Sequence, residues 1–369
     1  MTTQEILAII KPIRERLFLR NKSRKPIENR SPSAIVIEGK PTNEDGGPGS
    51  GNHGHAGVPG KRGGSAPSVG EVKSGKLGTF RPRSSGAREI DTADAFKEAQ
   101  TKKNSLSEHM DATGKLSAER QAVHDEIIRK FFDSKKAADG KPTLVMSGGG
   151  PASGKTFVRT EAESHFGPDS TVTIDPDSFK AMLPGYEEMA LKTDKAAGFY
   201  HEESSALAKR AYQYAADNGV NVVYDGTGDG SVKSVLSKLK VAQDAGYEVN
   251  ASYVTVDTEE ALKRNYARYE SQKAAYDSGK STVPPRLPHP DLVAKTHMKV
   301  SDISIQVANK FDHFELYDNN VAMGEKARLI ATCVKGGEIT AVPGCEDKLQ
   351  KYLDKGMSGA KVVDGKVKF

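Results

Sequence analysis

The chain has 369 residues, which is more than one typical domain, so we expect a second region or a long linker. Hydrophobic residues make up 36% and mean hydropathy is −0.58; no apolar stretch approaches the ~20 residues that a membrane-spanning helix needs. With no signal-peptide pattern at the N-terminus, and with Cys333 and Cys345 too few for a disulfide framework or a zinc site, we expect a soluble cytoplasmic protein without membrane contact.

The net charge of +5 is unevenly distributed. Residues 1–90 carry 16 Lys and Arg against 8 Asp and Glu, whereas the remainder carries 38 against 41. A basic arm on a near-neutral globule can contact nucleic acid or an acidic protein surface. It can equally be a solvated, disordered tail, and this is the commoner outcome for such a composition.

Two regions precede the part of the chain that has globular character. Residues 1–30 contain apolar side chains at helical spacing, which predicts an amphipathic helix. Residues 31–90 are expected to form a largely disordered, basic linker, because Gly46–Gly64 has nine glycines in nineteen residues and little to bury. His53 and His55 in that stretch could bind a metal, but without further ligands they are more often ordinary polar linker residues.

From residue 91 onward, helical patterns alternate with short apolar runs. This alternation predicts an α/β fold over residues 91–325, with a P-loop NTPase-type parallel sheet and helices on both faces. Residues 326–369 form a small C-terminal extension, with a hairpin and a short helix, to which we assign no chemistry. The predicted helices are Thr92–Glu108, Leu116–Phe132, one starting at Thr156, Lys195–Asn218, Val232–Ala245 and Glu259–Ser278. The predicted strands are Pro142–Ser147, Val172–Ile174, Val220–Tyr224, Glu248–Val256 and Phe314–Tyr317.

A phosphate-binding loop follows the first predicted strand. The run from Gly149 to Thr156 fits G-x-x-x-x-G-K-[ST] and opens a helix, so its backbone N–H groups can turn toward a phosphate. Lys155 would reach the β- and γ-phosphates, and the Thr156 hydroxyl would hold Mg²⁺. A chance glycine turn is the alternative, and both flanks argue against it. We therefore predict ATP or GTP binding by Gly149, Gly150, Pro151, Ala152, Ser153, Gly154, Lys155 and Thr156.

Carboxylates follow the next two strands, at the sheet edge where active residues of such folds gather. Asp177 is our candidate for the base that accepts a proton from a substrate hydroxyl, and Asp175 for a group that holds metal-bound water. Alternatively, both only cap the helix that begins there. Asp225 ends its strand like a Walker B acid that holds Mg²⁺, and Thr227 can contact phosphate or substrate. The alternative for Asp225 is a simple Asp-Gly turn.

Cations are dense between residues 263 and 286. A kinase of this type needs arginines that close over the transferring phosphoryl group, often from a mobile lid. Arg268 on a predicted helix and Arg286 in a proline-rich loop are our candidates, although most cations of such a stretch are solvated.

From about Leu116 to Asn319 the chain resembles the zeta toxin family of P-loop kinases. The order and spacing of several short segments together carry the resemblance. These segments are Ser117–His124, Gly149–Thr156, Ile174–Phe179, Pro184–Tyr186, His201–Ser204, Gly219–Thr227, Ala267–Glu270, Pro285–Arg286 and Leu316–Asn319.

This resemblance implies ATP- and Mg²⁺-dependent phosphorylation of a nucleotide-sugar hydroxyl, the 3′-hydroxyl of UDP-N-acetylglucosamine in characterised members. It also implies an antitoxin or immunity protein, here encoded separately. At the positions of this sequence that match the family's motifs, the resemblance implies that Asp177 is the base, and that Arg268 and Arg286 clamp the phosphates beside Lys155 and Thr156. Substrate-side contacts are expected from His201, Glu202 and Glu203.

Separately, the glycine-rich segment resembles one in tailed-phage head morphogenesis proteins. This implies a phage-encoded, virion-associated kinase with residues 1–86 attached to a capsid component. Two other functions stay open. One is a P-loop kinase for a different small-molecule or polynucleotide hydroxyl, and the other is a phage head-associated structural protein that binds nucleotide without turnover.

Overall fold

The computed structural model describes residues 104–193, 195–228, 230–281, 285, 287–322 and 324–369. The predicted N-terminal helix, the glycine-rich linker with its phage-like segment, and Arg286 lie outside these residues. No helix within the described ranges has the length and apolar character needed to cross a membrane.

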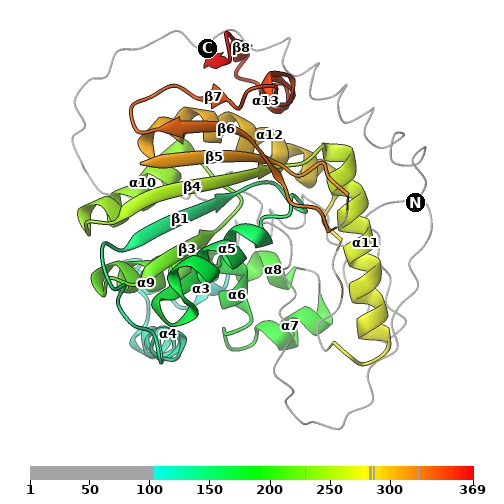
Figure 1. Cartoon of the computed structure of the whole chain (residues 1–369). Helices are drawn as coiled ribbons and strands as arrows, with labels where there is room; N and C mark the ends of the chain where they lie inside the picture. Colours follow the sequence, from blue (N-terminus) through cyan, green and yellow to red (C-terminus); the bar gives the residue numbers. More distant parts are fainter. Residues whose placement is uncertain (1–103, 194, 229, 282–284, 286, 323) are drawn as a thin grey trace.

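The strands of the described residues form one mixed sheet, in the order β2-β3-β1-β4-β5-β6-β7-β9-β8 (Figure 1). Neighbours from β2 to β5 run parallel, and those from β5 onward run antiparallel. The strands are β1 (Thr143–Gly148), β2 (Thr171–Ile174), β3 (Asn221–Asp225), β4 (Glu248–Thr255), β5 (His313–Asp318), β6 (Arg328–Val334), β7 (Thr340–Ala341), β8 (Lys361–Val363) and β9 (Lys366–Lys368).

The parallel half of the sheet is apolar because helices cover both of its faces. Every residue of β3 is buried, and in β1 only Val145 is half-buried. The register pairs Ser147 of β1 with Asp225 of β3, so the carboxyl ends of these strands meet at one edge. The predicted α/β fold with a P-loop NTPase-type parallel sheet is confirmed.

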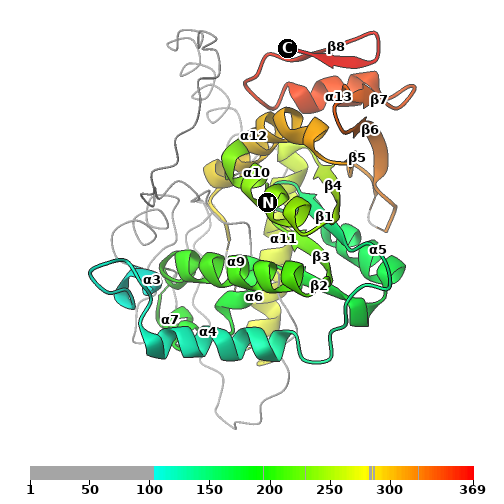
Figure 2. The same cartoon turned by 90° about the vertical axis from the view of Figure 1, so that its left-hand side faces the viewer.

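Helices lie on both faces of the sheet. Figure 2 shows α5 on one side and α9, α10 and α12 on the other. The helices are α3 (Ser105–Glu108), α4 (Ala118–Phe131), α5 (Thr156–Phe166), α6 (Pro176–Lys180), α7 (Tyr186–Lys192), α8 (Ala196–Phe199), α9 (His201–Asp217), α10 (Val232–Asp244), α11 (Thr258–Asp277), α12 (Pro290–Val307) and α13 (Glu346–Leu353), with 3-10 turns at Pro168–Ser170 and Ala308–Lys310.

The helices differ from the prediction at several points. Of the helix expected over Thr92–Glu108, the described part contains only α3, because Asn104 has extended dihedrals and caps it. Helix α7 was not predicted.

The helix expected over Lys195–Asn218 is interrupted at Tyr200, which has non-helical dihedrals and separates α8 from α9. Tyr200 is buried and its hydroxyl donates to Pro184 O at 3.1 Å, a contact that fixes the ring at this break. Helix α12 was not predicted, although Pro290 in its first turn and the buried Val293 and Val300 are ordinary helix signals.

The C-terminal residues continue the same sheet. Strand β6 pairs antiparallel with β5 and then with β7, so the predicted hairpin is confirmed, as is the short helix, which is α13. Their apolar side chains join the main core: Ile330 and Leu349 are fully buried there. Residues 328–368 are thus a structural part of the sheet (Figure 1).

Candidate active site

The predicted phosphate-binding loop connects β1 to α5, as the sequence indicated. Lys155 is 5% exposed, and its Nζ donates to Gly149 O at 3.0 Å. Thr156 is exposed as the first residue of α5. The N-terminus of α5 therefore faces the loop, where aligned N–H groups and the helix dipole favour an anion.

The loop needs glycine at Gly154 for two reasons. Its φ of +90° is a conformation that L side chains rarely adopt, and a Cβ would lie 2.2 Å from Nδ2 of Asn319. That amide nitrogen donates to Ser153 O at 2.8 Å, so the residue after β5 holds the loop from the side.

One aromatic ring lies against the loops that follow β1 and β3. Tyr253 of β4 is 1% exposed. A Cβ on Gly148 would lie 2.2 Å from its ring, and a Cβ on Gly228 would lie 2.9 Å from its hydroxyl oxygen. Any side chain at either glycine would therefore overlap the tyrosine.

Two buried carboxylates lie at the ends of neighbouring strands. Asp225 ends β3, and its Oδ1 accepts from Ser147 Oγ at 2.7 Å. Asp175 follows β2 and caps α6, accepting from Asp177 N at 2.9 Å and from Ser178 Oγ at 2.8 Å. Asp175 therefore caps α6, and its role toward a metal stays a prediction. Burial, followed by the neighbouring charge of Asp177, raises the pKa of Asp175 to about 7.

The proposed base carries an ion pair that sequence reasoning missed. Asp177 Oδ1 lies 2.5 Å from Nζ of Lys180, one turn further along α6, and the lysine side chain is only 5% exposed. The i, i+3 spacing of the two residues was the available signal. Arg268 of α11 is close enough for the charge of Asp177 to act on it: burial lowers the pKa of Arg268, and Asp177 opposes that effect.

One pocket brings together five of the predicted site residues from separate parts of the chain. Its lining includes Asp175, Asp177, His201, Asp225 and Thr227. Thr227 also contacts the phosphate-binding loop, because its backbone carbonyl accepts from Gly149 N at 2.9 Å. Residues from β3, α6 and α9, with Asp175 at the cap of α6, therefore converge beside the loop.

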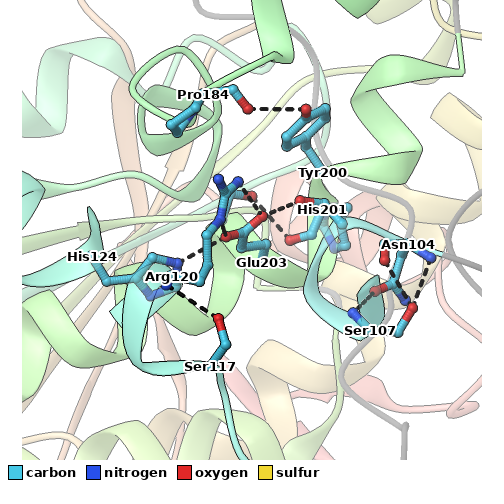
Figure 3. A network of polar contacts seen from close by, with 11 residues as sticks. Asn104, Ser107, Ser117, Arg120, His124, Pro184, Tyr200, His201 and Glu203 are labelled. Carbon is cyan, nitrogen blue, oxygen red and sulfur yellow. Dashed lines mark hydrogen bonds and ion pairs between the residues drawn. The ribbon is translucent and has the colours of Figure 1, made fainter. Parts of the chain in front are cut away.

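Glu203 lies elsewhere, in a fully buried network (Figure 3). Its carboxylate accepts from Arg120 Nε at 2.5 Å and contacts His124 Nε2 at 2.9 Å, and Ser105 Oγ also donates to it. Burial pushes the pKa of Glu203 upward, but the hydrogen bonds from His124, Arg120 and Ser105 outweigh it and hold the pKa at about 2. These contacts favour a structural role for Glu203, which holds the first turn of α9 in place, over direct contact with substrate.

The neighbours of Glu203 on α9 have different surroundings. His201 is also buried but lies in the pocket lining, whereas Glu202 is half-buried in the first turn of the helix. Arg120 and His124 were not predicted as site residues, although they are four residues apart on one face of α4, within a segment that carried the family resemblance.

The donor set suits a hard divalent cation. Mg²⁺ prefers oxygen ligands and usually retains waters and phosphate oxygens, so it needs only one or two protein carboxylates. Asp225 and Asp175 supply carboxylates at this edge, and Thr156 supplies a hydroxyl. In the described part of the chain no three His, Cys, Asp or Glu side chains form a metal-holding group.

A comparison with protein families settles the relationship of the chain. The zeta toxin family model matches residues 128–328, more than half of the 369 residues. The chain belongs to the zeta toxin family. The resemblance noted in the sequence is thereby confirmed at the level of the family.

This zeta toxin family member is similar to curated proteins named toxin zeta. It is 27% identical over 173 residues to that of Streptococcus pyogenes, covering 46% of this chain and 58% of the relative. It is 27% identical over 149 residues to that of Enterococcus hirae, covering 40% and 51%. The chain thus spans only about half the length of the curated relatives it matches.

Among solved structures, the zeta toxin family member is similar to one from the PezAT chromosomal toxin–antitoxin system of Streptococcus pneumoniae. That match has a TM-score of 0.46 and 18% identity, covering 56% of this chain and 80% of the other. Another match is AvrRxo1-ORF1:-ORF2 with ATP, with a TM-score of 0.49 and 20% identity, covering 67% and 76%.

Proposed function

We propose that the protein is an ATP-dependent kinase that phosphorylates a hydroxyl of a nucleotide sugar, with UDP-N-acetylglucosamine as the acceptor. One observation carries the proposal: Asp177 and Asp225 line a single pocket beside the phosphate-binding loop, and Arg268 lies within electrostatic reach of Asp177. Membership of the zeta toxin family supports the nucleotide-sugar acceptor.

Each residue has a defined task in the proposed reaction. Asp177 accepts the proton of the acceptor hydroxyl as its oxygen bonds to the γ-phosphorus of ATP and the bond to the ADP oxygen breaks. Lys155 and Arg268 balance the negative charge that spreads over the phosphoryl oxygens. Thr156 and Asp225 would hold Mg²⁺, and Asp175 would hold a water bound to it; the cation neutralises phosphate charge when it is bound. His201 and Thr227 would contact the acceptor, and Arg286 would add a further cation.

The biological setting follows from the relatives. The curated relatives are named toxins, which supports a toxic activity and a separately encoded antitoxin or immunity protein that restrains it. Attachment to a phage capsid through residues 1–86 remains a prediction from the glycine-rich segment alone.

The decisive experiment incubates the full chain with Mg-ATP and UDP-N-acetylglucosamine and determines product masses. We expect one added phosphate on the nucleotide sugar, and none with Lys155→Ala. Asp177→Asn should bind ATP like the wild type yet lower kcat by roughly 10²- to 10⁴-fold, as expected for loss of a general base.

A parallel reaction offers an oligonucleotide with a 5′-hydroxyl in place of the sugar. If phosphate is transferred to the oligonucleotide and not to the sugar, the acceptor is a polynucleotide 5′-hydroxyl and the proposed nucleotide-sugar acceptor is wrong. ATP binding without transfer to either acceptor would contradict the proposed nucleotide-sugar kinase, and full activity of Asp177→Asn would remove the assigned base.

A further inference from the structure

His297 of α12 packs against the phosphate-binding loop at Gly150 and Pro151. Its imidazole is buried, and Nε2 lies 3.0 Å from Pro151 O. A carbonyl oxygen can only accept, so Nε2 carries the hydrogen and donates it. A Cβ on Gly150 would lie 2.5 Å from the same ring, so the loop backbone rests directly on the imidazole.

Charge and burial keep this histidine neutral. Burial lowers the pKa of His297 to about 3, and the charges of Lys355 and Lys155 act in the same direction. A neutral ring has one N–H, and the contact with Pro151 O uses it. His297 is therefore a fixed hydrogen-bond donor to the loop across the physiological pH range.

Lys355 comes from the C-terminal part of the chain and holds the end of β4. Its Nζ donates to Thr255 Oγ1 at 2.6 Å and to Val256 O at 2.7 Å. The residue follows α13, which is anchored to α12 where Tyr352 O accepts from Ser301 Oγ at 2.8 Å. Lys355 thus ties the C-terminal residues to the strand that borders the loop.

The end of β4 is in contact with the loop at two points. A Cβ on Gly149 would lie 2.5 Å from Val254 O, so the two backbones touch. Thr255 O accepts from Asn319 N at 2.8 Å, and the Asn319 side chain donates to Ser153 O. A shift at the end of β4 would therefore move the loop directly and through Asn319.

We propose that His297 and Lys355 are positioning residues for the phosphate-binding loop, so that residues 328–368 contribute to nucleotide binding. His297 holds Pro151, and Lys355 holds the strand end against which Gly149 and Asn319 pack. The family match ends at residue 328, so this contribution comes from outside the matched segment. The inference rests on the proposed binding of ATP, but not on the identity of the acceptor.

The test measures the dissociation constant of a non-hydrolysable ATP analogue with Mg²⁺ by calorimetry, and Tm without nucleotide, on the full chain. Lys355→Met removes the donor and keeps most of the aliphatic stem; His297→Phe keeps the ring volume. We expect each variant to weaken analogue binding about tenfold while most of Tm is retained, because Lys355→Met exchanges a buried ammonium for an apolar side chain of similar length and His297→Phe preserves the packing of the ring.

Two further variants separate positioning from general damage. His297→Gln supplies an amide N–H for Pro151 O and should recover most of the affinity that His297→Phe loses. Lys351→Met is the matched control, since Lys351 lies four residues earlier, in α13, and pairs at the surface with Asp257. It should bind the analogue like the wild type.

The possible results are distinguishable. Wild-type affinity in Lys355→Met and His297→Phe would overturn the inference while the proposed kinase stands. Weak binding that His297→Gln fails to recover would also overturn it. If the wild type binds the analogue and phosphorylates no acceptor, the proposed function fails and the positioning role is still decided by the variants; a wild type that binds no analogue overturns both.

Discussion

At the scale of single residues, Lys180 forms a nearly buried ion pair with the proposed base. The Nζ of Lys180 lies 2.5 Å from Oδ1 of Asp177. A second carboxyl group, that of Asp175, is close enough to Asp177 for their charges to interact. The lysine supplies the cation that favours an ionised carboxylate, and only an ionised carboxylate can accept a proton. We expect Lys180→Met to lower kcat about tenfold or more at neutral pH, with recovery as pH rises, as measured by a pH–rate profile.

The matched variant is Lys180→Arg, which keeps a cation at this position and should retain most of the activity. A flat ratio of Lys180→Met to wild-type kcat at all pH values would show that the lysine does not act through the charge of Asp177.

The residues that could be predicted are those whose neighbours in sequence are also their neighbours in space. The loop from Gly149 to Thr156 is contiguous, and Asp225 directly ends a strand, so local pattern was enough to place them. Contacts between distant segments carry no such signal. Arg120 meets Glu203 across 83 residues, and His297 meets Pro151 across 146.

At the scale of elements, Glu203 joins α3 and α4 to the start of α9. Its pKa of about 2 is below the ordinary 4.5, so the ionised form stabilises the fold. That stabilisation is fully present above about pH 4.5 and is lost as pH falls through 2. We expect Glu203→Gln to lower the free energy of unfolding by about 3 kcal/mol at pH 7, with the difference vanishing toward pH 2, as measured by urea titration.

Glu202→Gln changes the neighbouring, half-buried residue by the same chemistry and should have a much smaller effect. If Glu203 acts only on substrate, its substitution would raise KM and leave the unfolding curves superimposed at every pH.

Element boundaries could be predicted where the hydrophobic period is uninterrupted, as in α4 and α10. The break between α8 and α9 could not, because it depends on the contact of Tyr200 with Pro184 rather than on helix propensity. Helix α12 carried the usual signals and could have been found.

At the scale of the whole molecule, residues 328–368 complete the core. Ending the chain after residue 327 would remove the strand that pairs with β5 and several buried side chains, among them Ile330, Leu349, Tyr352 and Leu353. Each such loss costs about 2–5 kcal/mol, and a whole domain has only about 5–15 kcal/mol to lose. We expect the shortened chain to lack a cooperative thermal transition in circular dichroism.

A chain that ends after residue 358 loses the β8–β9 hairpin with the buried Val367, and the buried Ala360 just before it. It should still melt cooperatively, at a lower temperature. Equal melting of the chain ending at residue 327 and the full chain would show that the C-terminal residues do not support the core.

Tyr253 affects how glycines near the site are interpreted when related sequences are compared, because its ring occupies the space where a Cβ of Gly148 or Gly228 would lie. The volume of one aromatic ring requires glycine at Gly148, whereas Gly228 is required both by the ring and by its φ of +73°, which L side chains rarely adopt. Positions 148 and 253 should therefore vary together during evolution: where a smaller residue replaces the tyrosine, alanine becomes acceptable at position 148, while position 228 stays glycine. A relative that lacks Gly148 can thus keep an intact nucleotide site, and the loss of that glycine is no sign of a lost activity.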